Sequence, residues 1–191
     1  MQRIAEYERS TNETSISVMV NIDGKGDHSI DTSIPFMDHL LSTLSKHSMM
    51  DMRVKCMSRD GIRHHLIEDT AIVLARAVDK ALGSRECIER FGYAIVPMDD
   101  SLAVASVDLV NRFYCIIDLR LSGGIEGVAK EDIEHFLYSF ASNLNSCMHI
   151  NVMYGHNDHH KAESAIKALA LALRNATRIT KDGVASTKGI L

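Results

Sequence analysis

Residues 64–68 read His-His-Leu-Ile-Glu, and residues 159–163 read His-His-Lys-Ala-Glu, 95 positions further along the chain. A second landmark repeats with them, because His39 precedes the first segment and His135 precedes the second, at a shift of 96 positions. A His-His-x-x-Glu pattern is expected by chance roughly 0.03 times in a chain of this composition. Two matches in corresponding places therefore predict a tandem duplication.

The hydrophobic pattern around these landmarks predicts the same order of elements in each half. Apolar residues alternate from Ile16 to Ile22, and the turn-forming residues 23–27 predict a hairpin to a third strand that ends before Pro35. The rest of the first half is predicted to form helices at 36–47 and 64–82 and a strand at 50–57. The second half is predicted to form strands at 91–96, 101–109, 113–121 and 147–154 and helices at 130–144 and 158–176.

The order βββαβα, repeated once, predicts an α+β fold in which two mixed four-stranded sheets sandwich four helices, a ribosomal-protein-domain-like arrangement. No Gly/Ser tract or low-complexity linker separates the halves. We therefore expect a single catalytic domain over residues 1–191, made of two pseudo-repeats, 1–88 and 89–177, with a basic C-terminal tail, 178–191.

The composition is that of an ordinary globular protein, with 191 residues, of which 46% are hydrophobic and 24% charged. The net charge of −4 creates no general field for nucleic acid or an anionic membrane, so we expect neither as a partner. No signal-peptide core and no run of about 20 apolar residues is present, so we expect a cytoplasmic protein. The four cysteines lie far apart in the sequence and predict neither a thiolate zinc site nor a disulfide framework.

The repeated motif predicts metal ligands. On a helix, its first His and its Glu lie on one face, whereas the second His points about 100° away and suits a second cation or a neighbouring subunit. With the two preceding histidines, the candidate ligands are His39, His64, His65, Glu68, His135, His159, His160 and Glu163. Two metals with imidazole and carboxylate ligands suit Mn²⁺, Fe²⁺, Ni²⁺ or Zn²⁺, and the sequence does not choose between them.

Phosphate-binding candidates are weaker when they are judged from the residues alone. Arg90 and Arg112 fall at predicted strand ends or turns, where a guanidinium can bind phosphate in a bidentate manner. Lys167 lies two turns beyond His160, and the segment 186–189 offers two hydroxyls and a cation. An exposed Arg that binds nothing is the commoner case, so none of these residues alone predicts a site.

These motifs together resemble the imidazoleglycerol-phosphate dehydratase family over essentially the whole chain. The matching segments are Arg9–Thr14, Pro35–Leu41, His64–Asp69, Arg90–Gly92, Pro97–Asp99, Glu134–Phe136, Gly155–Glu163 and Ser186–Gly189. The resemblance implies a carbon–oxygen lyase (hydro-lyase) of histidine biosynthesis that converts imidazoleglycerol phosphate to imidazole acetol phosphate and water through a metal-bound imidazolate. It also implies two Mn²⁺ ions per active site and a homo-oligomer of twenty-four subunits whose metals bridge neighbouring chains.

The resemblance further implies roles for individual residues. The substrate phosphate would be bound by Arg90, Arg112, Lys167, Ser186 and Lys188. The candidate catalytic carboxylates are Glu13, Glu68 and Glu163, and which of them acts as acid or base stays open. The chain departs from the family at Arg63, where an acidic residue usually precedes the first His-His, and at Leu66 and Thr43. At Arg63 we therefore expect the loss of a carboxylate that orients a ligating imidazole.

Two alternative functions keep the metals. One is a dinuclear hydrolase or a ferroxidase-like protein, but di-iron bundles are all-helical and use Glu-x-x-His, the reverse of the order found here. The other is a non-catalytic shell in which the histidines only hold subunits together. An activity assay separates this last alternative from a dehydratase.

Overall fold

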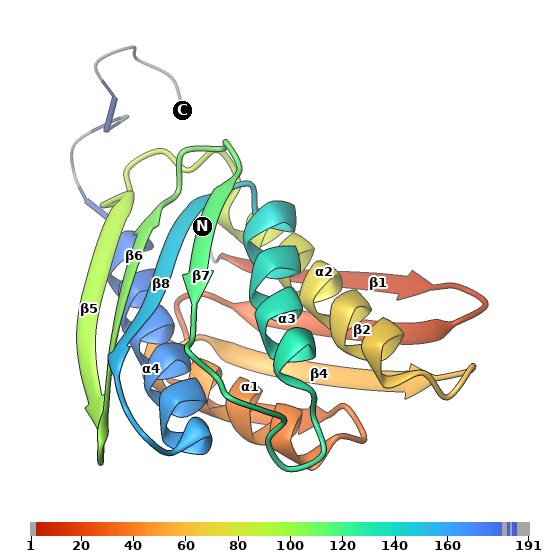
Figure 1. Ribbon diagram of the computed structural model, residues 1–191. Helices are drawn as coiled ribbons and strands as arrows, with labels where there is room; N and C mark the ends of the chain where they lie inside the picture. The colour runs from red at the N-terminus through yellow and green to blue at the C-terminus, as the bar shows by residue number, and fades with distance from the viewer. Residues whose placement is uncertain (1–2, 181–182, 184, 187–191) are drawn as a thin grey trace.

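The computed structural model describes residues 3–180, 183 and 185–186, and it contains the predicted order of elements in both halves (Figure 1). The first half forms β1 (Ile4–Ser10), β2 (Thr14–Asn21), β3 (His28–Asp31), α1 (Pro35–Ser48), β4 (Asp51–Ser58) and α2 (Arg63–Leu82). The second half forms β5 (Phe91–Met98), β6 (Ser101–Asp108), β7 (Tyr114–Asp118), α3 (Lys130–Asn143), β8 (Cys147–Tyr154) and α4 (Asp158–Ala176).

Each half builds one mixed sheet, with the order β1-β2-β4-β3 in the first and β5-β6-β8-β7 in the second. In the first sheet β2 is antiparallel to β1 and β4, and β3 is parallel to β4. In the second sheet β6 is antiparallel to β5 and β8, and β7 is parallel to β8. The predicted hairpin between β2 and the third strand is therefore wrong, because β4 lies between them. Alternate residues of β4 are buried, whereas β3 is largely exposed, so β4 takes the inner position and β3 the edge.

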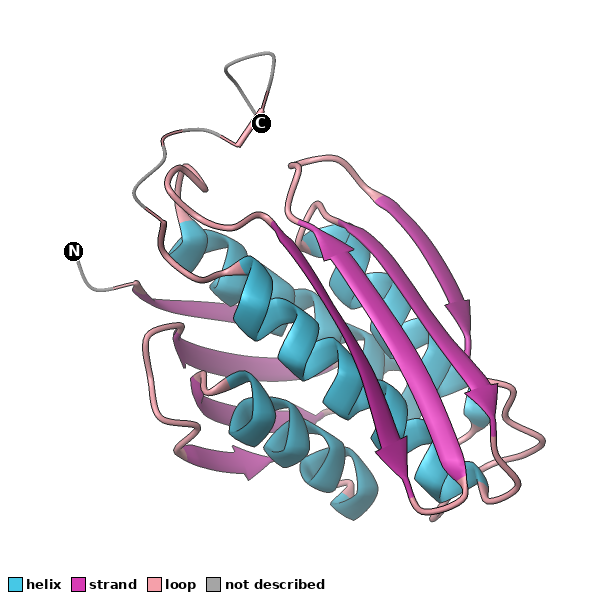
Figure 2. Cartoon of the chain, turned by 90° about the vertical axis from the view of Figure 1, so that its left-hand side faces the viewer, coloured by secondary structure: helices cyan, strands magenta, loops and turns pink. Residues whose placement is uncertain are grey.

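The four helices fill the space between the two sheets, as predicted (Figures 1 and 2). Helix α2 packs against β1 and β2, and α4 packs against β5 and β6. Across the middle, α2 packs on α3 and α1 packs on α4, so each of these helix pairs joins the two halves. Small residues on α4 allow this helix to pack closely on the second sheet, and the closest approach between α4 and β5 is at Gly92. A Cβ added at Gly92 would lie 1.9 Å from the carbonyl oxygen of Ala172.

The turn between β2 and β3 depends on Asp51, the first residue of β4. Its carboxylate accepts hydrogen bonds from the backbone amides of Lys25 and Asp27, at 2.7 and 3.0 Å, and from the side-chain amide of Asn21 at 3.1 Å. Burial raises the pKa of Asp51, but these three donors outweigh burial and hold it below its ordinary value. This carboxylate therefore fixes the turn-forming segment onto the central strand.

Within the described part of the chain, no helix is both long and apolar enough to cross a bilayer. The four cysteines are free; Cys56 is buried, whereas Cys87, Cys115 and Cys147 are only partly covered. The segment that joins the halves pairs with the beginning of the tail: the backbone amides of Glu89 and Arg90 bond to the carbonyls of Arg178 and Ala176. The division of the chain at residues 88 and 89 stays a prediction.

Candidate metal centres

Helices α2 and α3 bring together three of the predicted ligands: His64, Glu68 and His135. Their ligand atoms all lie within 4.8 Å of one another, and the Nε2 atom of His135 is 3.2 Å from Oε1 of Glu68. His64 and Glu68 share a face of α2 because they are four residues apart, as the motif predicts. We call this group the first cluster; two of its residues come from the first half of the chain and one from the second.

Helices α1 and α4 bring together the corresponding residues, His39, His159 and Glu163, which we call the second cluster. Oε2 of Glu163 lies 3.4 Å from Nε2 of His39 and 3.4 Å from Nε2 of His159. Its other oxygen, Oε1, is 2.8 Å from the ammonium group of Lys167. Burial raises the pKa of Glu163, but the hydrogen bonds and charges of Lys167 and His39 together outweigh it and keep the pKa below its ordinary value.

The second histidine of each motif points away from these clusters. Nδ1 of His65 lies 2.7 Å from Asp60 and 3.9 Å from Glu13, and these three residues form a further group of possible ligands. Nδ1 of His160 lies 2.5 Å from Asp100. The structure therefore divides the eight candidate ligands into two groups of three and two separate histidines.

The donor atoms of both clusters fit a divalent transition ion. Imidazole nitrogen and carboxylate oxygen are the ligands that Mn²⁺, Fe²⁺ and Zn²⁺ accept, and no thiol of the described residues belongs to either cluster. Nε2 of His135 is buried and has no hydrogen-bond partner among the described residues, although it faces Glu68. A buried ring nitrogen without a partner is costly unless it meets a cation or a donor. These observations support a metal role for the clusters, which stays a prediction.

The expected loss of an orienting carboxylate beside the first motif is wrong. Although Arg63 directly precedes the motif, Nδ1 of His64 lies 2.6 Å from Oδ1 of Asp132 on α3. Arg63 itself donates a hydrogen bond to the carbonyl of Gly127 at 2.7 Å. The sequence could not show this contact, because Asp132 lies 68 positions from His64 and reaches it only through the packing of α2 on α3.

Loops hold the start of α4 in place. Asn157 is the N-cap, and its side chain accepts hydrogen bonds from the backbone amides of His159 and His160. Asp158 bonds to the amides of Ser122 and Gly123 at 2.8 and 3.1 Å, so it fixes the loop between β7 and α3 against the motif. An open depression of about 580 Å³ lies here, and it is lined by Ser122, Gly124, Ile125, Glu126 and residues 156–160.

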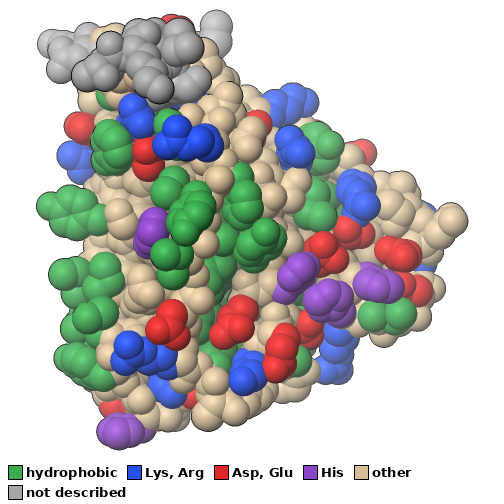
Figure 3. Space-filling model, turned by 45° about the horizontal axis from the view of Figure 1, so that its top comes forward, with side chains coloured by type: hydrophobic (Ala, Val, Ile, Leu, Met, Phe, Trp, Pro, Cys, Tyr) green, Lys and Arg blue, Asp and Glu red, His purple; other side chains and the backbone are tan. Residues whose placement is uncertain are grey.

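Glu13 lies in the turn between β1 and β2, more than half exposed. Asp69, the neighbour of Glu68, contacts the guanidinium of Arg9 and accepts a hydrogen bond from the hydroxyl of Thr14 at 2.5 Å. These contacts attach the turn that carries Glu13 to α2. Figure 3 shows histidine and acidic side chains gathered together on one face of the molecule.

The phosphate-binding candidates are dispersed. Arg90 is held by Asp108, with Nε 2.7 Å from Oδ1, and also donates to the carbonyl of Ala185 at 2.6 Å. Lys167 lies beside the second cluster, with its ammonium group 2.8 Å from Glu163. Arg112 is exposed in the loop between β6 and β7 and has no ion pair among the described residues. The structure therefore places Lys167 beside the candidate ligands and Arg90 beside the tail. Ser186 is described, and Lys188 lies outside the described residues.

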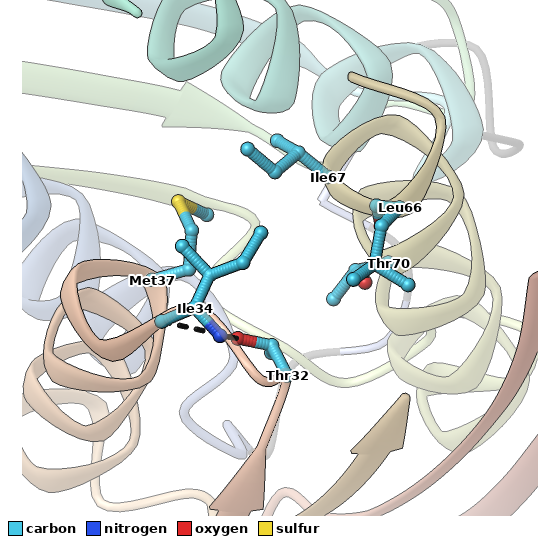
Figure 4. A pocket seen from close by; sticks show the side chains of 6 residues that line it. All are labelled: Thr32, Ile34, Met37, Leu66, Ile67 and Thr70. Atoms are coloured by element: carbon cyan, nitrogen blue, oxygen red, sulfur yellow. Dashed lines mark hydrogen bonds between the residues drawn. The ribbon is translucent and has the colours of Figure 1, made fainter. Parts of the chain in front are cut away.

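A closed apolar gap between α1 and α2 is a packing feature, not a candidate site (Figure 4). It is lined mainly by Ile34, Met37, Leu66 and Ile67, and it leaves no volume for a water molecule. The hydroxyl oxygen of Thr32 accepts a hydrogen bond from the backbone amide of Ile34 at its edge.

Comparison with known proteins gives a consistent result. The model of the imidazoleglycerol-phosphate dehydratase family matches residues 32–173. Imidazoleglycerol-phosphate dehydratase of Salinibacter ruber is 45% identical over 193 residues, which cover 99% of this chain and 96% of the relative. That of Chlorobaculum parvum is 41% identical over 189 residues, covering 98% and 97%.

Two solved structures share the fold. The dehydratase structure from Pyrococcus furiosus superposes with a TM-score of 0.85 at 37% identity, covering 96% of this chain and 99% of that chain. The structure of imidazoleglycerol-phosphate dehydratase from Staphylococcus aureus superposes with a TM-score of 0.84 at 26% identity, covering 93% and 99%. The predicted α+β duplication is therefore confirmed.

Proposed function

From the fact that this chain belongs to the imidazoleglycerol-phosphate dehydratase family, we propose that it works with two Mn²⁺ ions held by the first and second clusters. The protein is a hydro-lyase of histidine biosynthesis. In the reaction we propose, imidazoleglycerol phosphate loses water and becomes imidazole acetol phosphate. The metal dependence is supported by two clusters, each of two histidines and one glutamate. Within each cluster the ligand atoms lie within 4.8 Å of one another.

The difficult step is the removal of a proton from a carbon attached to an imidazole ring, because such a C–H bond is barely acidic. Two bound ions would supply Lewis-acid stabilisation of the negative charge that the ring acquires. The chain itself must supply a base and an acid. Glu163 suits proton transfer because it is largely buried, lies within the second cluster and is ionised at neutral pH. Glu13 and Glu68 are more exposed and are the other candidates.

The phosphate group of the substrate needs cations near the clusters. Lys167 is the best placed, because it is already within 2.8 Å of Glu163. We propose that Arg90, Arg112, Ser186 and Lys188 bind the phosphate with it. Arg90 is positioned for this role by Asp108, whose carboxylate accepts hydrogen bonds from Nε at 2.7 Å and from Nη2 at 3.0 Å. The hydrogen bond from Arg90 to the carbonyl of Ala185 holds the beginning of the tail next to Arg90.

We propose that the site is completed by a second copy of the chain, within a twenty-four-subunit assembly. His65 and His160 point away from both clusters of their own chain, and we propose that each completes a cluster of a neighbouring subunit. The outer face of the second sheet is also apolar and exposed, with Phe91 at 58%, Tyr93 at 75% and Ile95 at 63% exposure. A face of this kind is typical of a surface that is covered in an assembly.

The oligomeric state tests this part of the proposal. Sedimentation of the full chain with Mn²⁺ should show one large species, and Tyr93→Asp should reduce its size by placing a charge on the apolar face. The matched control is Tyr7→Asp, because Tyr7 is an exposed tyrosine of the other sheet. A monomer at micromolar concentration with Mn²⁺ present would exclude a shared site.

The decisive experiment for function is incubation of the metal-stripped chain with imidazoleglycerol phosphate, with and without added Mn²⁺, while the ketone is followed. We expect product only when the ion is present. Metal binding without any turnover would favour the non-catalytic shell. The all-helical di-iron bundle is already excluded, because eight strands form two sheets.

A further inference from the structure

The two clusters have corresponding ligands but different surroundings. Three residues before its cluster histidine, α3 carries Asp132, whereas α1 carries Phe36 at the same place. Asp132 lies 2.6 Å from Nδ1 of His64. Phe36 instead packs against the ring of His159, the counterpart of His64, with centroids 5.2 Å apart. Among the described residues, Nδ1 of His159 has no hydrogen-bond partner.

A carboxylate at Nδ1 changes what an imidazole can do. A carboxylate only accepts hydrogen bonds, so the ring proton lies on Nδ1 and the lone pair lies on Nε2. The ring is thereby held in the tautomer that binds a cation through Nε2, and its basicity is increased. The side chain of Asp132 is 15% exposed and that of His64 is 47% exposed, so the carboxylate is largely covered while the imidazole is partly open to water. Phe36 is buried and offers His159 only an apolar surface.

A second difference concerns the cluster carboxylates. Four residues after Glu163 stands Lys167, whose ammonium group is 2.8 Å from Oε1 of that carboxylate. Four residues after Glu68 stands Ile72, and no Lys or Arg of the described residues forms an ion pair with Glu68. The first cluster therefore has one carboxylate of its own, Glu68, and a second, Asp132, in contact with His64. In the second cluster the charge of one carboxylate is offset by a lysine, which also competes with a cation for its oxygen.

Both differences act in the same direction, because a divalent cation is attracted by nearby negative charge and repelled by positive charge. Resting on the proposed two-metal function, we propose that the two centres are inequivalent, with the first cluster binding its ion first and more tightly because Asp132 positions His64. Asp132 is a positioning residue for that centre, and Lys167 keeps the second centre weaker. The exchangeable ion is then the one beside the lysine that we assign to the substrate phosphate.

The rival explanation for Asp132 is a general one. It lies in the first turn of α3, where an acidic residue stabilises the helix dipole without any role toward a metal. Glu131 occupies the same turn, is 70% exposed and has only a distant contact with Lys130. Glu131→Gln therefore removes the same charge from the same helix end and leaves His64 untouched, which makes it the matched control.

The experiment is a Mn²⁺ titration of the metal-stripped full chain in which the free ion is counted by its electron paramagnetic resonance signal. Native protein should show two affinity classes of equal size. His135→Ala should abolish the tight class and His39→Ala the loose class, which assigns each class to its cluster. Asp132→Asn and Asp132→Leu should weaken the tight class about 10- to 100-fold, the usual effect of removing such a carboxylate, and leave the loose class unchanged. Asp132→Glu should restore part of the affinity.

Three results would overturn the inference while leaving the proposed function intact. These are a single affinity class in native protein, an equal effect of Asp132→Asn and Glu131→Gln, and a weakened loose class in Asp132→Asn. Lys167→Met offers an independent check, because loss of the ammonium group should tighten the loose class. Absence of any Mn²⁺ binding by the native chain would instead overturn the metal-dependent function itself. Sedimentation of every variant shows whether its assembly is unchanged.

Discussion

Nε2 of His135 lies 3.2 Å from Oε1 of Glu68, although the two residues belong to different halves of the chain. The same relationship recurs on the other side of the molecule, where His39 of the first half lies 3.4 Å from Glu163 of the second. Each cluster is therefore assembled across the helix pairs that join the two sheets. Any change that shifts α2 relative to α3, or α1 relative to α4, therefore separates the candidate ligands of a cluster.

Glu163→Gln should lower turnover at least ~10³-fold, the order found when a core catalytic group is removed. The amide keeps the shape of the side chain but can neither accept a proton nor neutralise Lys167. The comparison is steady-state kinetics with saturating Mn²⁺ against Glu6→Gln, which changes an exposed carboxylate of β1. Near-normal turnover of metal-replete Glu163→Gln would remove this residue from the mechanism.

His64→Ala should also lower turnover at least ~10³-fold, but for a different reason, since it removes a proposed metal ligand of the first cluster. The loss should be accompanied by the disappearance of one bound ion, measured by elemental analysis after dialysis. His28→Ala is the control, because His28 is exposed and lies in neither cluster. Full metal content in His64→Ala would show that His64 is not a ligand.

Arg112→Ala should raise KM and change kcat little, because the guanidinium is exposed and is assigned only to the substrate phosphate. Arg112→Lys should recover part of the loss, since it keeps the charge but not the bidentate geometry. Initial rates over a range of substrate concentrations decide the matter. An unchanged KM in Arg112→Ala would exclude this residue from the phosphate site.

Asp51→Asn should destabilise the fold by about 1–3 kcal/mol at pH 7, the value of hydrogen bonds to a charged group. The folded pKa of Asp51 is lowered, so its contribution is fully present above the unfolded pKa of about 3.9 and is lost as the pH falls through the folded value. Urea unfolding should therefore separate native protein from the variant at pH 7 and less so at pH 3. Asp27→Asn, in the same turn but exposed, should change little. A constant difference at both pH values would contradict this account.

Gly92→Ala should destabilise the protein by about 1–3 kcal/mol or more, because the added Cβ meets helix backbone that cannot move aside. It would lie 1.9 Å from the carbonyl oxygen of Ala172 and 2.7 Å from the amide nitrogen of Ala176. Thermal unfolding followed by circular dichroism measures the effect. Gly123→Ala is the matched control, since nothing lies within 4 Å of its new Cβ. Equal melting temperatures for the two variants would show that β5 and α4 can separate without cost.

Much of the fold could be predicted because local patterns determine it. The helices that carry the motifs begin and end within about one residue of the predicted positions, since apolar spacing and Pro35 and Gly83 mark their ends. Strand pairing was less accessible. The residues between β2 and β3 are typical of a turn, but a turn does not show that the two strands it joins pair with each other. Which strand pairs with β2 depends on the burial of β4, which comes later in the chain. Only the packed sheet shows that β4 takes the inner position.

Part of the candidate site could likewise be predicted from local sequence, and part of it depends on tertiary packing. His64 and Glu68 could be placed on one face because helical geometry fixes residues four apart. That His135 joins them depends on how α3 packs against α2, which no local pattern determines. The carboxylates at Nδ1 of the motif histidines, Asp132 among them, were missed for this reason. An Asp in the first turn of a helix, as Asp132 is, has a sufficient local explanation in the helix dipole.

The division of both clusters between the two halves limits what a half-length polypeptide could do. A peptide ending near residue 88 would contain His39, His64 and Glu68 but not the residues that face them. Two identical copies, each lending a helix to the other, would be needed before either could capture an ion. The duplication thus joins in one chain two halves that would otherwise have to associate from solution. Co-expressed fragments 1–88 and 89–191 should therefore bind an ion only when they associate with each other.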